Sequence, residues 1–146
     1  MSKARPLVVM TPKSLLRLPA AASTMDELAN GGFQKVIDDP AVEDRDKITK
    51  LVLCSGKVYY DIAGHEERAS ADHIAVVRVE MLYPFPENEL RELMESYPNL
   101  ERVVWVQEEP RNMGARAFMR RRMAAILPED LHYYYVGRQL LSLIHI

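Results

Sequence analysis

The sequence predicts an α/β domain in which a mostly parallel, five-stranded sheet is flanked by helices on both faces. Short apolar runs, typical of buried strands, alternate along the chain with segments of helical periodicity. Residues 74–79 are nearly all apolar, as expected of a central strand that is covered on both faces. Parallel neighbours need crossover connections, which the intervening helices would supply. The five expected strands are residues 7–10, 51–54, 74–79, 103–106 and 131–136.

Composition limits the classes of protein to which the chain can belong. Its 146 residues fit one domain, which we place at residues 1–140. The net charge of -2 argues against nucleic acid or an anionic membrane as a partner, since both require clustered positive charge. The single cysteine, Cys54, cannot form an internal disulfide, which suits a reducing compartment. The apolar run near the N-terminus stops at Thr11 and Pro12, too early for a signal peptide or a membrane span, so we expect a soluble intracellular protein.

The expected helices follow from capping residues and spacing. Pro12 suits the first turn of a helix with Thr11 as its cap, and Thr24 with Glu27 predicts a capping box inside the loosest stretch, residues 18–45. Three further helices should follow: one after Gly56, one starting at Pro86 and one after Gly114. The helix after Gly56 has apolar positions at Val58, Tyr59 and Ile62, and the helix from Pro86 has them at Leu90, Leu93, Met94 and Tyr97. The last helix has them at Ala115, Phe118 or Met119, Met123 and Ile126. Arg116, Arg120 and Arg121 should lie on the outside of the last helix.

Gly56 and Lys57 follow a strand, where the free N–H groups of a helix start could hold a phosphate. A phosphate loop also needs a glycine where the chain has Leu51 and a serine or threonine where it has Val58, which argues against nucleotide hydrolysis. An anion site and a plain strand-to-helix turn both remain open.

Glu108 and Glu109 are adjacent carboxylates, which we place in a turn beyond the end of a strand, where open α/β sheets bind ligands. Paired carboxylates can act as acid and base, but neighbours in an extended segment point to opposite sides. We therefore expect structural roles: one caps the helix entered near Asn112, and the other meets an arginine or a partner subunit.

Neither the histidines nor the cysteine predicts a catalytic or metal site. His65, His73, His132 and His145 share no ligand spacing. Cys54 ends an apolar run, which indicates an inert buried thiol.

Four ordered segments closely resemble the C-terminal domain of the thiamine diphosphate-dependent 2-oxoglutarate dehydrogenase component. They read PLVVMTPKSLLR (6–17), CSGKVYYD (54–61), RVEMLYPFP (78–86) and WVQEEPRNMGAR (105–116). The resemblance covers residues 6–138. The family usually has an aromatic residue at the position of Arg116, which puts that local contact in doubt.

The resemblance implies a transketolase-type C-terminal domain with one antiparallel edge strand. It implies a homodimeric parent oxidoreductase of the tricarboxylic acid cycle that decarboxylates 2-oxoglutarate with thiamine diphosphate and magnesium. The succinyl group then passes to a lipoyl-bearing succinyltransferase component. The cofactors would lie between upstream domains of the same chain, so we expect no catalytic, cofactor-binding or metal-binding residue here and an inactive fragment. Glu108, Glu109 and Arg116 would then be structural or interface residues. The parent would be cytoplasmic in bacteria and in the mitochondrial matrix in eukaryotes.

Some bacterial members of this family have an allosteric acetyl-CoA site at a domain interface. By resemblance and charge, we expect Thr11, Lys13, Arg45 and Lys50 to lie near it. The alternative function is a free-standing α/β module that binds a nucleotide or CoA.

Residues 141–146, LSLIHI, match what a common sequencing adapter would encode in one frame. The family continues differently after its Gly-Arg, with a small-residue stretch and a final helix. We therefore expect a non-native tail at 141–146, and the alternative is a natural apolar tail.

Overall fold

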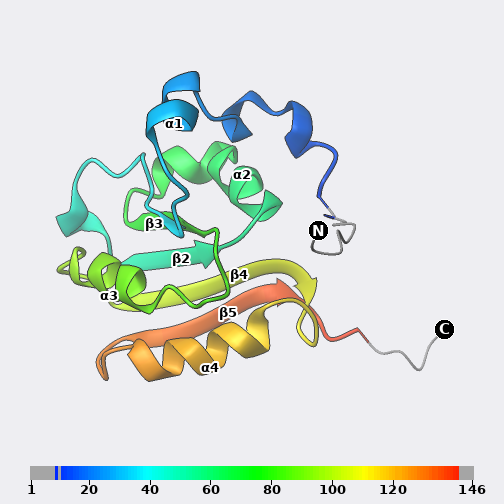
Figure 1. Ribbon diagram of the computed structural model, residues 1–146. Coiled ribbons are helices and arrows are strands. Elements are labelled where there is room, and N and C mark those ends of the chain that lie inside the picture. Colours follow the sequence, from blue (N-terminus) through cyan, green and yellow to red (C-terminus); the bar gives the residue numbers. More distant parts are fainter. Residues whose placement is uncertain (1–8, 10, 142–146) are drawn as a thin grey trace, which may run out of the picture. The chain divides into compact units, whose positions relative to one another are not determined.

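The computed structural model describes residue 9 and residues 11–141 (Figure 1). The chain divides into two compact units, Met1–Gly32 and Phe33–Ile146. Residues 142–146 of the expected non-native tail lie outside the described residues. No helix among the described residues is both long and apolar enough to span a membrane.

In the described part of the first unit, the only elements are short helical segments. They are the 3-10 turns η1 (Leu15–Arg17) and η2 (Pro19–Ala21) and the α-helix α1 (Met25–Asn30). We expected a helix to start at Pro12 with Thr11 as its cap, and this prediction was wrong. The turn η1 instead follows Ser14, and the Leu15 N–H donates to the Pro12 carbonyl at 3.1 Å. A longer helix is blocked because the residue before Pro19 is extended, as proline requires. The capping box at α1 is confirmed, since the Glu27 N–H donates to Thr24 Oγ1 and the Thr24 N–H donates to Glu27 Oε2.

The second unit is built on a five-stranded sheet. Its strands are β1 (Val36–Ile37), β2 (Lys50–Cys54), β3 (Ile74–Val79), β4 (Arg102–Pro110) and β5 (His132–Arg138), in the order β1-β3-β2-β4-β5. β1 runs antiparallel to β3, and all other pairs are parallel. The expected α/β class, the mostly parallel sheet and the single antiparallel edge strand are confirmed.

The strand expected at residues 7–10 is not among the five strands of the described sheet. Residue 9 is exposed and lies in no strand, while residues 7, 8 and 10 lie outside the described residues. The fifth strand is β1, inside the stretch that we expected to be loose. It pairs through Val36 opposite Val79 and Ile37 opposite Arg78, and the Lys35 carbonyl accepts from the N–H groups of Glu80 and Met81. Two residues are too few to show a period, so backbone pairing rather than a hydrophobic pattern defines this strand.

The helices cover both faces of the sheet (Figure 1). α2 (Lys57–Ala63) connects β2 to β3, α3 (Glu87–Glu95) connects β3 to β4, and α4 (Arg116–Ile126) connects β4 to β5. The chain crosses the sheet in one direction from β2 to β3 and in the other direction from β3 through β4 to β5. Because parallel crossovers are right-handed, α2 lies on one face and α3 and α4 lie on the other. The 3-10 segments η3 (Arg45–Lys47) and η4 (Glu66–Ser70) complete the described elements of this unit.

Each face has its own core. The smaller core joins Val52, Cys54, Val76 and Val104 to α2, through Val58, Tyr59 and Ile62. In the larger core, Trp105 lies among the buried side chains of α3 and α4, which are Leu90, Met94, Met119, Met123 and Ile126. The predicted apolar stripes of both helices are therefore confirmed. Arg120 and Arg121 are exposed as expected, whereas Arg116 is half-buried.

Candidate functional site

The carboxyl ends of the parallel strands bring Lys57, at the start of α2, close to Glu108 in β4. The Lys57 ammonium lies 3.9 Å from the Glu108 carboxylate and also pairs with Asp61 one helical turn away. The hydrogen bond to Asp61 raises the pKa of the Lys57 ammonium. Gly56 has a φ of 72°, which its lack of a side chain allows. With its cation held by two carboxylates, this segment is better described as a strand-to-helix turn than as an anion site.

β4 continues to Pro110, so Glu108 and Glu109 lie in its last residues and not in the turn that we expected. α4 begins only at Arg116, and no side chain caps it. The prediction that a glutamate caps the helix near Asn112 was therefore wrong. The reason is that residues 110–114 form a turn held by other contacts, which delays the helix.

Gln107 holds that turn, and sequence reasoning missed it. Its side chain is buried, accepts a hydrogen bond from Trp105 Nε1 at 3.0 Å and donates one to the Met113 carbonyl at 2.8 Å. Gly114 has a φ of 63°, and a Cβ there would lie 2.8 Å from Gln107 Nε2. The available signal was an amide side chain two residues after a tryptophan, directly after the apolar run 103–106.

Arg116 lies against β5 and not on the outside of α4 as expected. Its guanidinium stacks on the ring of Tyr135 at 4.8 Å, and its Nε is buried without a hydrogen-bond partner among the described residues. Stacking covers the planar face of an arginine, which explains how it is accommodated between α4 and β5. Burial raises the pKa of the neighbouring Tyr133 phenol to about 12, and Arg116 partly offsets this effect.

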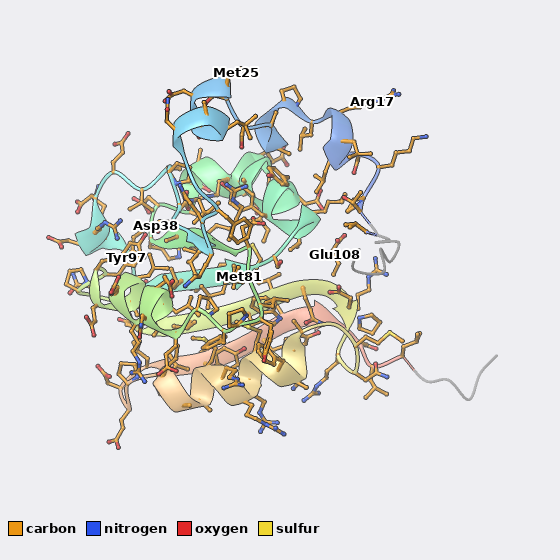
Figure 2. The ribbon with its side chains drawn as sticks, viewed as in Figure 1. Arg17, Met25, Asp38, Met81, Tyr97 and Glu108 are labelled. Atoms are coloured by element: carbon orange, nitrogen blue, oxygen red, sulfur yellow. The ribbon has the colours of Figure 1, made fainter. Side chains whose placement is uncertain are left out.

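Arg45, in η3, lies near the opposite edge of the sheet, where the parallel strands begin, and its partners Asp38 and Tyr97 are labelled in Figure 2. Its guanidinium donates to the Asp38 carboxylate and to Ser96 Oγ, and it stacks on the Tyr97 ring at 4.7 Å. The Tyr97 hydroxyl in turn donates to Asp38 at 2.6 Å. Burial, followed by this hydrogen bond, raises the pKa of the Tyr97 phenol. Arg45 thus joins the loop after β1 to the C-terminal end of α3.

Lys50, the first residue of β2, is half-buried at this same edge, and its N–H donates to the His73 carbonyl at 3.2 Å. Thr11 and Lys13 are exposed and belong to the first unit. Whether Thr11 and Lys13 meet Arg45 and Lys50 in one site stays a prediction.

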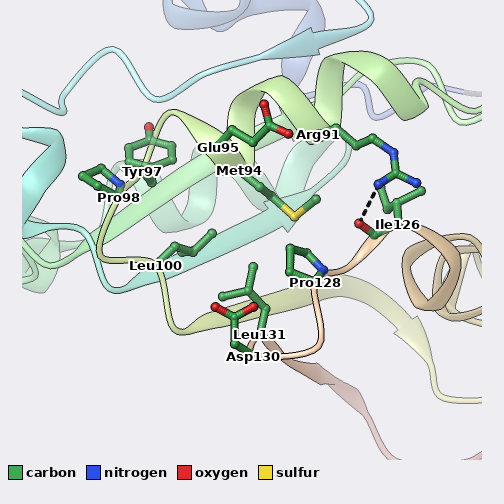
Figure 3. A pocket seen from close by; sticks show the side chains of 10 residues that line it. All are labelled: Arg91, Met94, Glu95, Tyr97, Pro98, Leu100, Ile126, Pro128, Asp130 and Leu131. Atoms are coloured by element: carbon green, nitrogen blue, oxygen red, sulfur yellow. Dashed lines mark hydrogen bonds between the residues drawn. The ribbon is translucent and has the colours of Figure 1, made fainter.

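A pocket of about 240 Å³ opens between the ends of α3 and α4 and the loop before β5 (Figure 3). Arg91 closes one side by donating to the Ile126 carbonyl at 3.2 Å. Apolar side chains form much of the lining, and Glu95 and Asp130 add two carboxylates. No sequence pattern predicted this pocket.

The described residues contain no group of three or more histidine, cysteine, aspartate or glutamate side chains placed to hold a metal ion. Cys54 is buried, as the sequence predicted, and its Sγ lies 3.6 Å from the Val77 carbonyl, to which it can donate. Burial raises the pKa of its thiol to about 12, which disfavours the reactive thiolate.

Comparison with known proteins connects this domain to one family. A family model described as 2-oxoglutarate dehydrogenase C-terminal matches residues 22–144. Proteins named 2-oxoglutarate dehydrogenase E1 component are similar to the chain: that of Coxiella burnetii is 46% identical over 136 residues, and that of Azotobacter vinelandii is 48% identical over 138 residues. Each alignment covers 92% of this chain but only 15% of the relative. With a family match over most of its length and the fold that the resemblance implied, the chain belongs to the 2-oxoglutarate dehydrogenase C-terminal family.

Proposed function

We propose that this chain is the C-terminal structural and regulatory domain of a 2-oxoglutarate dehydrogenase E1 component. The match of the family model to residues 22–144 carries the proposal. The α/β fold, with its mostly parallel sheet and one antiparallel edge strand, supports it independently of sequence identity.

The parent enzyme, in this proposal, oxidatively decarboxylates 2-oxoglutarate within the tricarboxylic acid cycle. Thiamine diphosphate supplies the electron sink for decarboxylation, with Mg²⁺ neutralising its diphosphate. The succinyl group then passes to a lipoyl-bearing succinyltransferase partner. The parent acts as a homodimer, in the cytoplasm if its source is bacterial like the relatives.

We assign both cofactors to upstream domains of the parent, as the resemblance implies, and two polar side chains at the carboxyl edge of this sheet support the assignment because they already have partners. Lys57 pairs with Asp61 and Glu108, and Gln107 holds the turn after β4. This donor set does not fit a diphosphate with its metal ion. In this domain, Glu108, Glu109 and Arg116 then have structural or interface roles.

A chimera tests the proposal. The matched C-terminal segment of the Azotobacter vinelandii relative is replaced by this chain, and the relative truncated before that segment serves as the control. We expect thiamine diphosphate-dependent decarboxylation of 2-oxoglutarate by the chimera and none by the truncated control. A chimera as inactive as the control would contradict the proposal.

The isolated chain separates this function from that of a free-standing nucleotide- or CoA-binding module. We expect no decarboxylation by the isolated chain and no heat of binding with thiamine diphosphate, ATP or NAD in calorimetry. Tight binding of any of these ligands would favour the module.

We further propose an acetyl-CoA regulatory site near Thr11, Lys13, Arg45 and Lys50. The half-buried Lys50 and the partly exposed Arg45, both near the amino edge of the sheet, favour an anionic ligand such as the phosphates of CoA. In the chimera, alanine at each of the four positions should raise the acetyl-CoA concentration needed for half-maximal activation, while Arg45→Lys should retain more of the response. Unchanged activation curves for all four alanine variants would remove this site.

A further inference from the structure

The helix α1 carries an apolar side that is exposed in the described structure. Met25, labelled in Figure 2, is 81% exposed, and Leu28 is 70% exposed. Their spacing of three residues places them on one side of the helix. The polar side chains Asp26 and Asn30 hydrogen-bond to each other on another side. Leu16, in the preceding turn η1, is also 71% exposed.

This segment is too short to be stable without a surface to pack on. Isolated helices of fewer than about 12–15 residues are marginal in water, and α1 has six. The capping box satisfies N–H groups at its start, but none of the described residues between 11 and 32 is buried. Most helices in proteins are stabilised by packing of an apolar side, so α1 requires a complementary apolar surface.

The relatives indicate where that surface lies. Their alignments cover 92% of the chain and therefore include residues before 22, where the family model begins. The alignment with the E1 component of Azotobacter vinelandii thus includes this segment. The matched region makes up only 15% of that protein. Because the matched family region is described as C-terminal, most of such a protein precedes it. A tethered upstream domain is present at a high effective concentration, which favours it over a separate molecule.

We propose that η1 and α1 form an interdomain clamp, in which Leu16, Met25 and Leu28 insert into an apolar groove of the upstream domain of the parent E1 chain. The clamp rests on the proposed function, because the upstream domain belongs to that parent. It fixes the position of the sheet domain relative to the rest of the enzyme.

Limited proteolysis of the chimera tests the clamp, since Lys13 and Arg17 provide trypsin sites beside it. The test variant is Met25→Gln with Leu28→Gln, which keeps side-chain length and helix propensity but removes the apolar side. The matched control is Asp26→Gln with Asn30→Gln on the polar side. We expect cleavage at Lys13 and Arg17 to be at least tenfold faster in the test variant and within twofold of the parent chimera in the control. Equal protection of both variants would overturn the clamp.

Two further measurements identify the surface on which α1 packs. In the isolated chain, the test variant should melt within one degree of the unsubstituted chain, and a loss of several degrees would mean that α1 packs on its own sheet domain. Protection in the chimera should not change on dilution, whereas loss of protection on dilution would indicate a second copy. Either result would overturn the clamp. Decarboxylation of 2-oxoglutarate is scored separately, so an inactive chimera with a protected clamp would contradict only the proposed function.

Discussion

Asp39 should be among the polar side chains on which the stability of the sheet depends most. Its side chain is 4% exposed. Its carboxylate accepts hydrogen bonds from the Val76 N–H at 2.7 Å, the Ala41 N–H at 2.9 Å and the Arg68 guanidinium at 2.6 Å. The register of β1 on β3, continued past Ile37, places residue 39 opposite Val76. The Asp39 carboxylate therefore takes the place of a strand at the outer edge of β3.

The substitution Asp39→Ala should lower the free energy of unfolding by about 3–5 kcal/mol. Removing one member of a buried ion pair costs about this much, because the other charge is left uncompensated. Arg68 would keep only its hydrogen bond to the Ala71 carbonyl, and the Val76 N–H would lose its acceptor. Asp39→Asn retains an acceptor for Val76 but loses the charge, so we expect a loss of about 1–3 kcal/mol.

Urea unfolding followed by far-ultraviolet circular dichroism measures these differences, with an unchanged dependence on urea as the check that unfolding remains two-state. Asp61→Asn is the matched control, because Asp61 forms an exposed pair with Lys57 and should contribute less than about 1 kcal/mol. Adding Arg68→Ala to Asp39→Ala should cost less than the sum of the single losses, since the two groups interact directly. An Asp39→Ala variant within 1 kcal/mol of the unsubstituted chain would refute this reasoning.

Three other predictions concern the β4 turn, the cysteine and the tail. Gly114→Ala should lower the free energy of unfolding by at least about 1–2 kcal/mol, because Gly114 has a positive φ and a Cβ there would contact Gln107. Gly32→Ala, where a Cβ would meet open space, should change it by less than about 0.5 kcal/mol. Thermal unfolding of both variants measures the difference. The pKa of Cys54 is raised to about 12 from its ordinary 9.0, so its contribution to stability is complete below pH 9 and is lost as the pH rises towards 12. Between pH 8 and 10.5 the unsubstituted chain should therefore lose about 2 kcal/mol more than Cys54→Ala in urea unfolding, and parallel curves would contradict the assignment. Deleting residues 141–146 should leave the melting temperature within a degree or two, since exposed changes rarely exceed about 0.5 kcal/mol, and a large loss would show that the tail is native.

The strands β2 to β4 and the two long helices could be predicted because each buries a repeating set of apolar side chains. β5 could be predicted because its alternate side chains, Tyr133 and Tyr135, are half-buried against the core. The edge strand β1 could not, since its stability comes from backbone pairing with β3 and from the Asp39 carboxylate. Its partners lie about forty residues away, in a segment that gives no local sign of them. Gln107 was missed for a related reason: its role depends on the turn that follows it, and a lone glutamine in a strand does not reveal which carbonyls it will meet.

The charged residues show a more general limit of sequence reasoning about sites. The positive charges of Arg45 and Lys57 made both residues candidates for anion binding, yet in the fold each of them pairs with a carboxylate. For Arg45 those contacts come from Asp38, Ser96 and Tyr97, on segments up to fifty-two positions away, so no local pattern could show that the charge was engaged. A phosphate at Arg45 would have to compete with Asp38 for the guanidinium. Arg45→Ala would therefore test structure and binding together, and Asp38→Asn separates the two effects. If Arg45 binds the phosphates of acetyl-CoA, Asp38→Asn should lower the concentration needed for activation, because it removes the competing charge while an amide oxygen can still accept a hydrogen bond. If Arg45 is purely structural, Asp38→Asn should change stability and leave the activation curve where it was.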